Sequence, residues 1–109
     1  MGPIRFTSLS AVTATGAGIA NEMFAPRNLN TMQVIITGGP TAVKVNLEAS
    51  SDGGTTWGTI ATFDTAAGNV SGDFVSASDA SVNRIRANLV TLTGGTSPTV
   101  TAIINSECN

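Results

Sequence analysis

Three aspartates are the first side chains of this sequence that could do chemistry. Asp64, Asp73 and Asp79 could in principle supply oxygen ligands for calcium, or a pair of carboxyl groups for acid–base work. They lie, however, in connections rich in glycine, alanine and serine, without the regular acidic spacing of an ion-binding loop. We therefore expect neither a metal site nor a catalytic carboxyl pair here.

Two arginines form the next candidate group. Arg84 and Arg86 are two residues apart, so on a strand they project from one face and could hold a phosphate. Two arginines on a strand more often pair with carboxylates such as Glu48, or reach across a subunit interface. We favour these last two interpretations over a phosphate site.

Nucleophilic and metal-binding side chains are scarce. The 109-residue sequence has no histidine and a single cysteine, Cys108. This excludes Ser-His-Asp and Cys-His catalysis and most zinc sites, and it makes an intrachain disulfide impossible. We interpret Cys108 as an exposed thiol rather than an interchain bridge. We expect no enzyme, no catalytic residue and no cofactor.

The charge content also limits the classes of molecule that this protein could bind. The net charge is -2, which argues against nucleic acid, because basic side chains supply most of the affinity for phosphate backbones. Charged residues make up 11% of the chain, compared with roughly 25% in average soluble domains. So few charges suggest that much of the surface contacts other protein.

The elements that would position these side chains are strands. In residues 42–49, Val43, Val45 and Leu47 alternate with polar residues, and residues 84–89 and 100–104 show the same period of two. Residues 32–37 are β-branched on both faces, which predicts a central strand covered on two sides. Weaker strands are predicted at residues 4–9, 57–63 and 73–75, whereas residues 18–27 fit either a helical turn or a strand. We predict one all-β domain, an antiparallel β-sandwich of jelly-roll or immunoglobulin type with seven or eight short strands.

Three clusters of turn residues separate these strands. They are residues 38–40 (Gly-Gly-Pro), 52–54 (Asp-Gly-Gly) and 94–98 (Gly-Gly-Thr-Ser-Pro). Glycine allows a positive φ and proline fixes φ near -65°, so each cluster reverses the chain. We predict three hairpins.

The N-terminal segment is assigned separately, with residues 1–20 before a sandwich domain of residues 21–109. It matches a signal peptide poorly because it has no continuous apolar block, it is too short to span a membrane, and Phe6 breaks the myristoylation pattern. We expect a soluble protein, made and assembled inside a cell. Ile4, Phe6 and Leu9 make the segment either an extended arm that docks on a neighbour or the first strand of the sandwich. These residues, with Arg84 and Arg86, are the candidate interface.

The best-defined motif is residues 50–57, Ser-Ser-Asp-Gly-Gly-Thr-Thr-Trp. Its five defining positions, which fit the S-x-D-x-G-x-T-W pattern of the Asp-box, are Ser50, Asp52, Gly54, Thr56 and Trp57. The resemblance implies a hairpin in which Asp52 accepts hydrogen bonds in the turn while Trp57 packs beneath and anchors it to the core. Glycan stacking by Trp57 and a cation site at Asp52 are the alternatives. In sialidases the box lies apart from the active site, so no catalytic residue is carried over.

A broader resemblance covers roughly the C-terminal two thirds. Residues 37–57, 84–89 (Arg-Ile-Arg-Ala-Asn-Leu) and 92–100 resemble small β-sandwich proteins encoded among the structural genes of tailed bacteriophages. The resemblance implies assembly rather than catalysis: a capsid decoration (cement) protein that binds the major capsid protein on the outer face of a phage head. A homotrimer is expected because three-fold positions recur over an icosahedral shell. We expect location on the virion surface after assembly in the host cytoplasm, without nucleic acid or membrane as partner. The alternative is a carbohydrate- or receptor-binding module of a tail fibre or baseplate.

Overall fold

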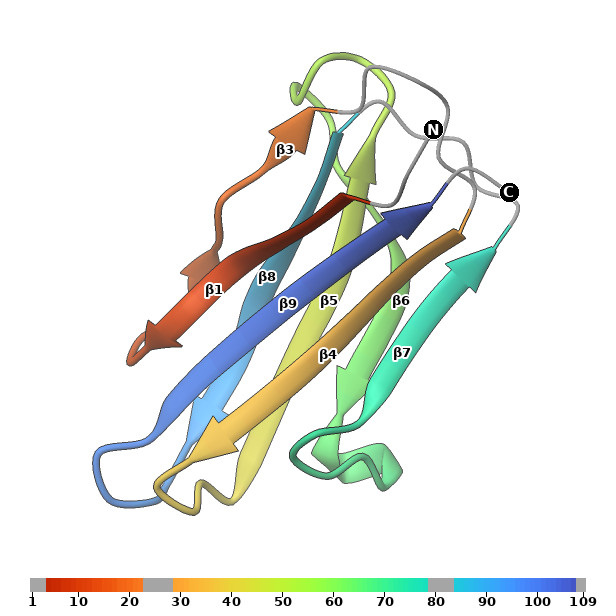
Figure 1. Ribbon diagram of the computed structural model, residues 1–109. Helices are drawn as coiled ribbons and strands as arrows, with labels where there is room; N and C mark the ends of the chain where they lie inside the picture. Colours follow the sequence, from red (N-terminus) through yellow and green to blue (C-terminus); the bar gives the residue numbers. More distant parts are fainter. Residues whose placement is uncertain (1–3, 23–28, 79–83, 108–109) are drawn as a thin grey trace.

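The chain folds almost entirely into strands (Figure 1). The computed structural model describes residues 4–22, 29–78 and 84–107. The elements are β1 (Ile4–Val12), β2 (Gly16–Ala17), β3 (Asn21–Glu22), β4 (Leu29–Thr37), β5 (Ala42–Ser50), β6 (Gly58–Asp64), the 3-10 turn η1 (Thr65–Ala67), β7 (Phe74–Ser78), β8 (Arg84–Thr93) and β9 (Thr99–Glu107). Within the described ranges, no helix is long and apolar enough to cross a membrane.

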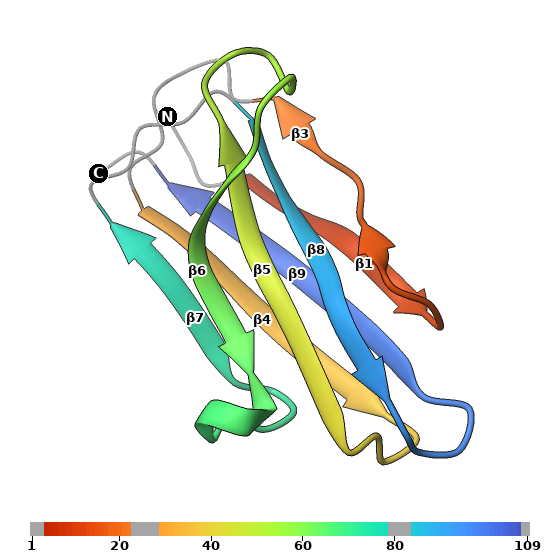
Figure 2. The same cartoon turned by 180° about the vertical axis from the view of Figure 1, so that it is seen from behind.

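These strands form two antiparallel sheets packed face to face, as Figures 1 and 2 show from opposite sides. The first sheet has the order β1-β9-β4-β7, and the second has the order β2-β8-β5-β6 with β3 also paired to β8. The predicted all-β antiparallel sandwich is confirmed. β2 and β3 pair with successive stretches of the same edge of β8, so together they fill one strand position. Counted in this way, the two sheets have eight strand positions among the described residues. This order, with chain crossings between the sheets, is that of a jelly roll.

Alternation of apolar and polar residues produces the core. In β5, β8 and β9 every second side chain is apolar and points between the sheets, where it loses its contact with water. The largest side chains that are fully buried there are Phe63, Met32, Leu47, Ile85, Leu89 and Ile104. Two polar side chains, Asn30 and Ser106, are also buried in this layer. They satisfy each other, since the Ser106 hydroxyl donates to Asn30 Oδ1 at 2.7 Å.

Only the middle one of the three predicted hairpins is present. The turn after Ser50 joins β5 to its neighbour β6, whereas the turns at 38–40 and 94–98 carry the chain from one sheet to the other. The prediction for these two turns is wrong, because alternation and turn residues mark where a strand ends but not which sheet the next strand joins. The two crossings pack against each other, and the Thr96 amide donates to the Gly38 carbonyl at 2.8 Å.

The N-terminal segment supplies an edge strand of its own chain. β1 pairs with β9 and is shifted in register at two places. Leu9, which was expected at an interface, is 2% exposed in the core, and Phe6 packs against the same core. The interface expected at Leu9 is therefore wrong for this fold. The side chain of Ile4 lies outside the described part of the structure.

Ser8 joins this edge strand to the other sheet. Its hydroxyl donates to the Ile19 carbonyl at 2.7 Å and accepts the Ala87 amide at 2.9 Å, so β1, the segment between β2 and β3, and β8 meet at one oxygen. Gly18 lies against this contact, and a Cβ there would stand 2.2 Å from the Ser8 carbonyl oxygen. This edge of the sandwich is thus closed by specific hydrogen bonds.

The expected central strand is only half covered. β4 lies between β9 and β7, so its interior position in the sheet is as predicted. Met32 and Val34 face the core, but Ile35 on the opposite face is 37% exposed. The prediction that both faces of this strand are covered is therefore wrong for a single chain.

Candidate functional site

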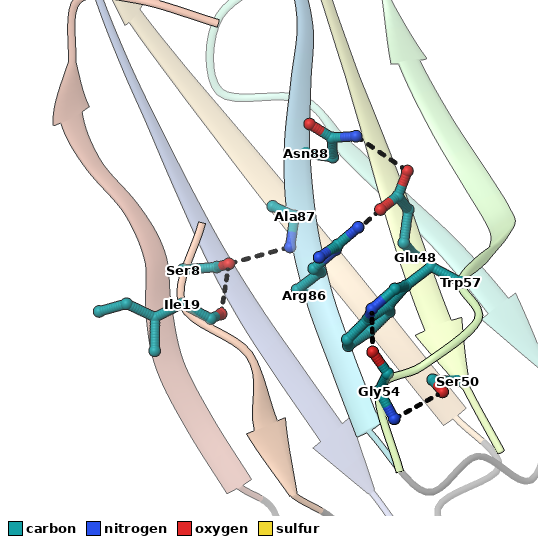
Figure 3. A network of polar contacts seen from close by, with 9 residues as sticks. All are labelled: Ser8, Ile19, Glu48, Ser50, Gly54, Trp57, Arg86, Ala87 and Asn88. Carbon is teal, nitrogen blue, oxygen red and sulfur yellow. Dashed lines mark hydrogen bonds and ion pairs between the residues drawn. The ribbon is translucent and has the colours of Figure 1, made fainter. Parts of the chain in front are cut away.

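The predicted hairpin residues and the two arginines are carried by the β5–β6 turn, β5 and β8 of the second sheet, which faces the viewer in Figure 2. The predicted residues Phe6 and Leu9 lie on β1 of the first sheet instead. Two groups lie side by side on the outer face of the second sheet. The hairpin cluster consists of Ser50, Asp52, Gly54, Thr56 and Trp57. The carboxylate cluster consists of Glu48, Arg86 and Asn88, and Figure 3 shows it next to Ser50, Gly54 and Trp57. β5 and β8 position both groups, because Glu48 and Arg86 are direct cross-strand partners.

Hydrogen bonds within the turn define the hairpin cluster. The Ser50 hydroxyl donates to Asp52 Oδ1 at 2.7 Å and accepts the Gly54 amide at 3.0 Å. Asp52 Oδ1 also accepts the Thr56 amide at 2.9 Å. Gly53 and Gly54 have φ of 76° and 95°, which side chains with a Cβ rarely adopt. The turn geometry implied by the Asp-box resemblance is therefore present.

The Asp52 carboxylate is held in its charged form. Hydrogen bonds from the Thr56 amide and from the Ser50 hydroxyl lower the pKa of Asp52 from 3.8 to about 2. Donors that favour the carboxylate disfavour its protonation. The lowered pKa thus has a structural cause in the turn itself, which is the opposite of what a general acid needs.

Trp57 does not anchor the hairpin to the core, so that prediction is wrong. The residue is half-buried on the outer face, and its indole Nε1 donates to the Gly54 carbonyl at 3.0 Å. The guanidinium carbon of Arg86 lies 4.1 Å from the ring centroid. The turn places the indole over a polar face of the sheet, where a cation covers it.

Glu48 is the centre of the carboxylate cluster. It is 8% exposed, and its Oε1 accepts from Arg86 Nε at 2.9 Å while its Oε2 accepts from Asn88 Nδ2 at 3.0 Å. Both carboxylate oxygens are therefore occupied, which a buried charge requires. The predicted pairing of the arginines with carboxylates such as Glu48 is confirmed for Arg86.

Arg84 pairs with a different carboxylate. Its guanidinium lies 3.3 Å from Glu22 Oε1, so it links β8 to β3. Gly54 comes close to this side chain, since a Cβ there would stand 3.2 Å from Arg84 Cδ. The turn, Arg84 and β3 therefore form one continuous contact at the end of the sheet.

The remaining aspartates act in turns. Asp64 Oδ1 accepts the Ala66 amide at 2.9 Å and caps η1, and Asp73 Oδ2 accepts the Val70 amide at 2.8 Å. Asp79 lies outside the described residues. Within the described ranges, no three histidine, cysteine or acidic residues come together as metal ligands.

The polar groups of the hairpin and carboxylate clusters satisfy one another, whereas the Nε of the neighbouring Arg84 is buried without a hydrogen-bond partner. Each group in the two clusters bonds to another group of the same face, which stabilises the β5–β6 turn and the β5–β8 pair. Sequence reasoning missed Asn88 and the stacking of Arg86 on Trp57. The alternation of Arg84, Arg86 and Asn88 along one strand was the available signal, but the register with Glu48 was needed to use it.

The fold has relatives among solved structures. The SPBc2 prophage-derived protein YomS superposes with a TM-score of 0.62 at 16% sequence identity, over 96% of this chain and 92% of that one. The PBSX exported protein XepA superposes with a TM-score of 0.61 at 13% identity, over 97% of this chain, which spans 38% of the XepA chain. No family model and no curated protein matches the sequence. The likeness establishes a shared sandwich fold.

Proposed function

We propose that this chain is a non-enzymatic structural protein of a phage virion, and specifically a capsid decoration protein. It binds the major capsid protein on the outer face of the head and stabilises the joints between capsomers. The observation that carries the proposal is the fold shared with the SPBc2 prophage-derived protein YomS, which covers nearly the whole length of both chains.

The chemistry of the described surface supports a structural role. The polar groups of the hairpin and carboxylate clusters bond to one another, which leaves a rigid surface rather than a reacting centre. The chain carries few charges, at 11%, so contacts with other proteins require little desolvation of charge. Jelly rolls are also a recurrent architecture of viral capsid domains.

A decoration protein acts through binding free energy. Each copy that bridges two capsomers must be released before the joint opens, so bound copies raise the resistance of the shell to heat and internal pressure. The proposed location is the virion surface, reached after assembly in the host cytoplasm. The homotrimer expected from shell symmetry stays a prediction.

The test is reconstitution on isolated heads. Purified protein is added to heads that lack it, unbound protein is removed by sedimentation, and the bound copies and the temperature of shell disruption are measured. Saturable binding with a raised disruption temperature supports the proposal. Absence of binding to heads, or binding without any change in shell stability, contradicts the decoration role.

A glycan- or receptor-binding module of a tail is the second candidate. The observation that favours it is the position of Trp57 on the outer sheet face, where an indole can meet a sugar ring. Arg86 already covers the ring, and the chain has no tyrosine and no other tryptophan to extend a sugar platform. A glycan array decides: selective binding that is lost in Trp57→Phe, with the fold retained, would favour this function.

A further inference from the structure

The outer face of the first sheet is open in the single chain. It is made by the outward side chains of β1, β9, β4 and β7, and no described segment passes over it in Figure 1. We call it the threonine-rich face. Its members are Arg5, Thr7, Thr31, Gln33, Ile35, Thr37, Phe74, Ser76, Thr99, Thr101, Ile103 and Asn105.

Apolar side chains lie on three neighbouring strands of this face. Gln33 of β4 is paired with Phe74 of the edge strand β7 on one side and with Ile103 of β9 on the other. Ile35 follows Gln33 on the same face, one step further along β4. Ile35 is 37% exposed on an interior strand and Phe74 is 60% exposed at the edge, so two large apolar groups of this face meet water.

The pattern of β4 is that of a strand buried on both faces. Val34, Ile35 and Ile36 are consecutive β-branched residues, a pattern typical of strands that are covered from two sides. The single chain covers only the side of Val34. A partner that packs on the threonine-rich face would cover the other.

The distribution of charge favours a second copy as the partner. Arg5, on the edge strand β1, is the one charged group among the described side chains of this face. The opposite face of the sandwich carries Lys44, Glu48, Arg84 and Arg86. A two-fold contact brings like residues of one face together, and a face without charges at its centre can pair with itself without repulsion.

The size of the face is sufficient for such a pair. Three strands of nine residues and one of five, spaced by about 4.8 Å with about 3.4 Å per residue, present roughly 500 Å² per copy. Two copies then bury on the order of 1,000 Å², which reaches the lower limit of specific interfaces. The β-branched side chains at the centre and Phe74 at the edge supply the shape for close sheet packing.

We propose that two copies of this chain associate through their threonine-rich faces about a two-fold axis, with Ile35 and Ile103 at the centre of the contact and Phe74 at its β7 margin. The proposal does not depend on the function proposed above. A flat face covers only one other copy, so the assembly closes as a dimer, in contrast to the trimer expected from shell symmetry.

Sedimentation equilibrium of the full chain tests the proposal. Wild-type protein is compared with Ile35→Lys, which places a charge at the centre of the contact, and with Phe74→Arg, which places one on its edge strand β7. Val90→Arg is the matched control, because Val90 is 44% exposed but lies on β8 in the other sheet. Circular dichroism and urea midpoints establish that each variant is folded.

The proposal expects a wild-type dimer, a dimer in Val90→Arg, and folded monomers in both variants of the threonine-rich face, with the dimer dissociation constant raised at least tenfold. A wild-type monomer or trimer overturns it. A dimer that both variants retain also overturns it. If wild-type protein is monomeric but binds phage heads, and Phe74→Arg abolishes that binding, the partner that packs on the threonine-rich face is the shell protein and not a second copy.

Discussion

The Arg86 guanidinium interacts with two different partners. Its carbon lies 4.1 Å from the centroid of the Trp57 ring, and its Nε donates to Glu48 Oε1 at 2.9 Å. The turn that carries Trp57 is therefore fastened to the charged network of the sheet rather than to the apolar core. Two of the predictions below follow from this arrangement.

Trp57→Ala should lower the free energy of unfolding by about 1–3 kcal/mol, because it removes one hydrogen bond, a cation contact and a half-buried ring. Phe63→Ala, at a side chain that is 0% exposed, should lower it by about 3–5 kcal/mol. Urea unfolding followed by circular dichroism measures both. If the two variants lost the same free energy of unfolding, Trp57 would contribute as much as a core residue, which would contradict its position on the outer face.

Glu48→Ala should destabilise the protein by about 1–3 kcal/mol, because it leaves donors of Arg86 and Asn88 without their acceptor. Glu48→Gln keeps one acceptor oxygen and should lose less. Urea midpoints show which of the two variants loses more stability. Thr62→Ala is the control, because it removes an exposed hydrogen bond to Asn46 on the same sheet face. If the alanine variant is as stable as wild type, the carboxylate cluster contributes nothing to stability.

The lowered pKa of Asp52 predicts a specific acid sensitivity. The group is charged in the folded state down to a pKa of about 2, compared with 3.8 without the turn. Its contribution to stability is therefore complete above pH 3.8 and is lost as the pH falls through about 2. Urea midpoints measured from pH 5 to 2 should fall less steeply in Asp52→Asn than in wild type. Identical slopes of urea midpoint against pH in the two proteins would show that protonation of Asp52 is not coupled to unfolding.

Gly18→Ala should be strongly destabilising. A Cβ would stand 2.2 Å from the Ser8 carbonyl oxygen and 2.7 Å from Ser8 Oγ, so the contact that joins β1 to β8 must open. Overpacking of this kind lowers the unfolding free energy by about 1–3 kcal/mol or more. Gly58→Ala is the control, because nothing lies within 4 Å of a Cβ there. Thermal midpoints should fall in the first variant only; equal midpoints would refute the close approach.

Local patterns predicted the strands, but the pairings needed the whole chain. The alternation at Val43, Val45 and Leu47 predicted both the strand and its buried face, since period two is a local property. Which turn forms a hairpin depends on strands far away in sequence, so the crossings at 38–40 and 94–98 were misassigned. Trp57 was expected to pack on the core because the Asp-box resemblance implies it. The register between Glu48 and Arg86 instead places a guanidinium beside the ring on the outer face.

The central claim is that the chain is a decoration protein of a phage head. Its most direct test is a quantitative gel of purified particles from the phage that encodes the chain, with heads and tails separated before analysis. The account predicts the protein on heads, in hundreds of copies and in a fixed ratio to the major capsid protein. Recovery with tails alone, or absence from both fractions, would contradict it.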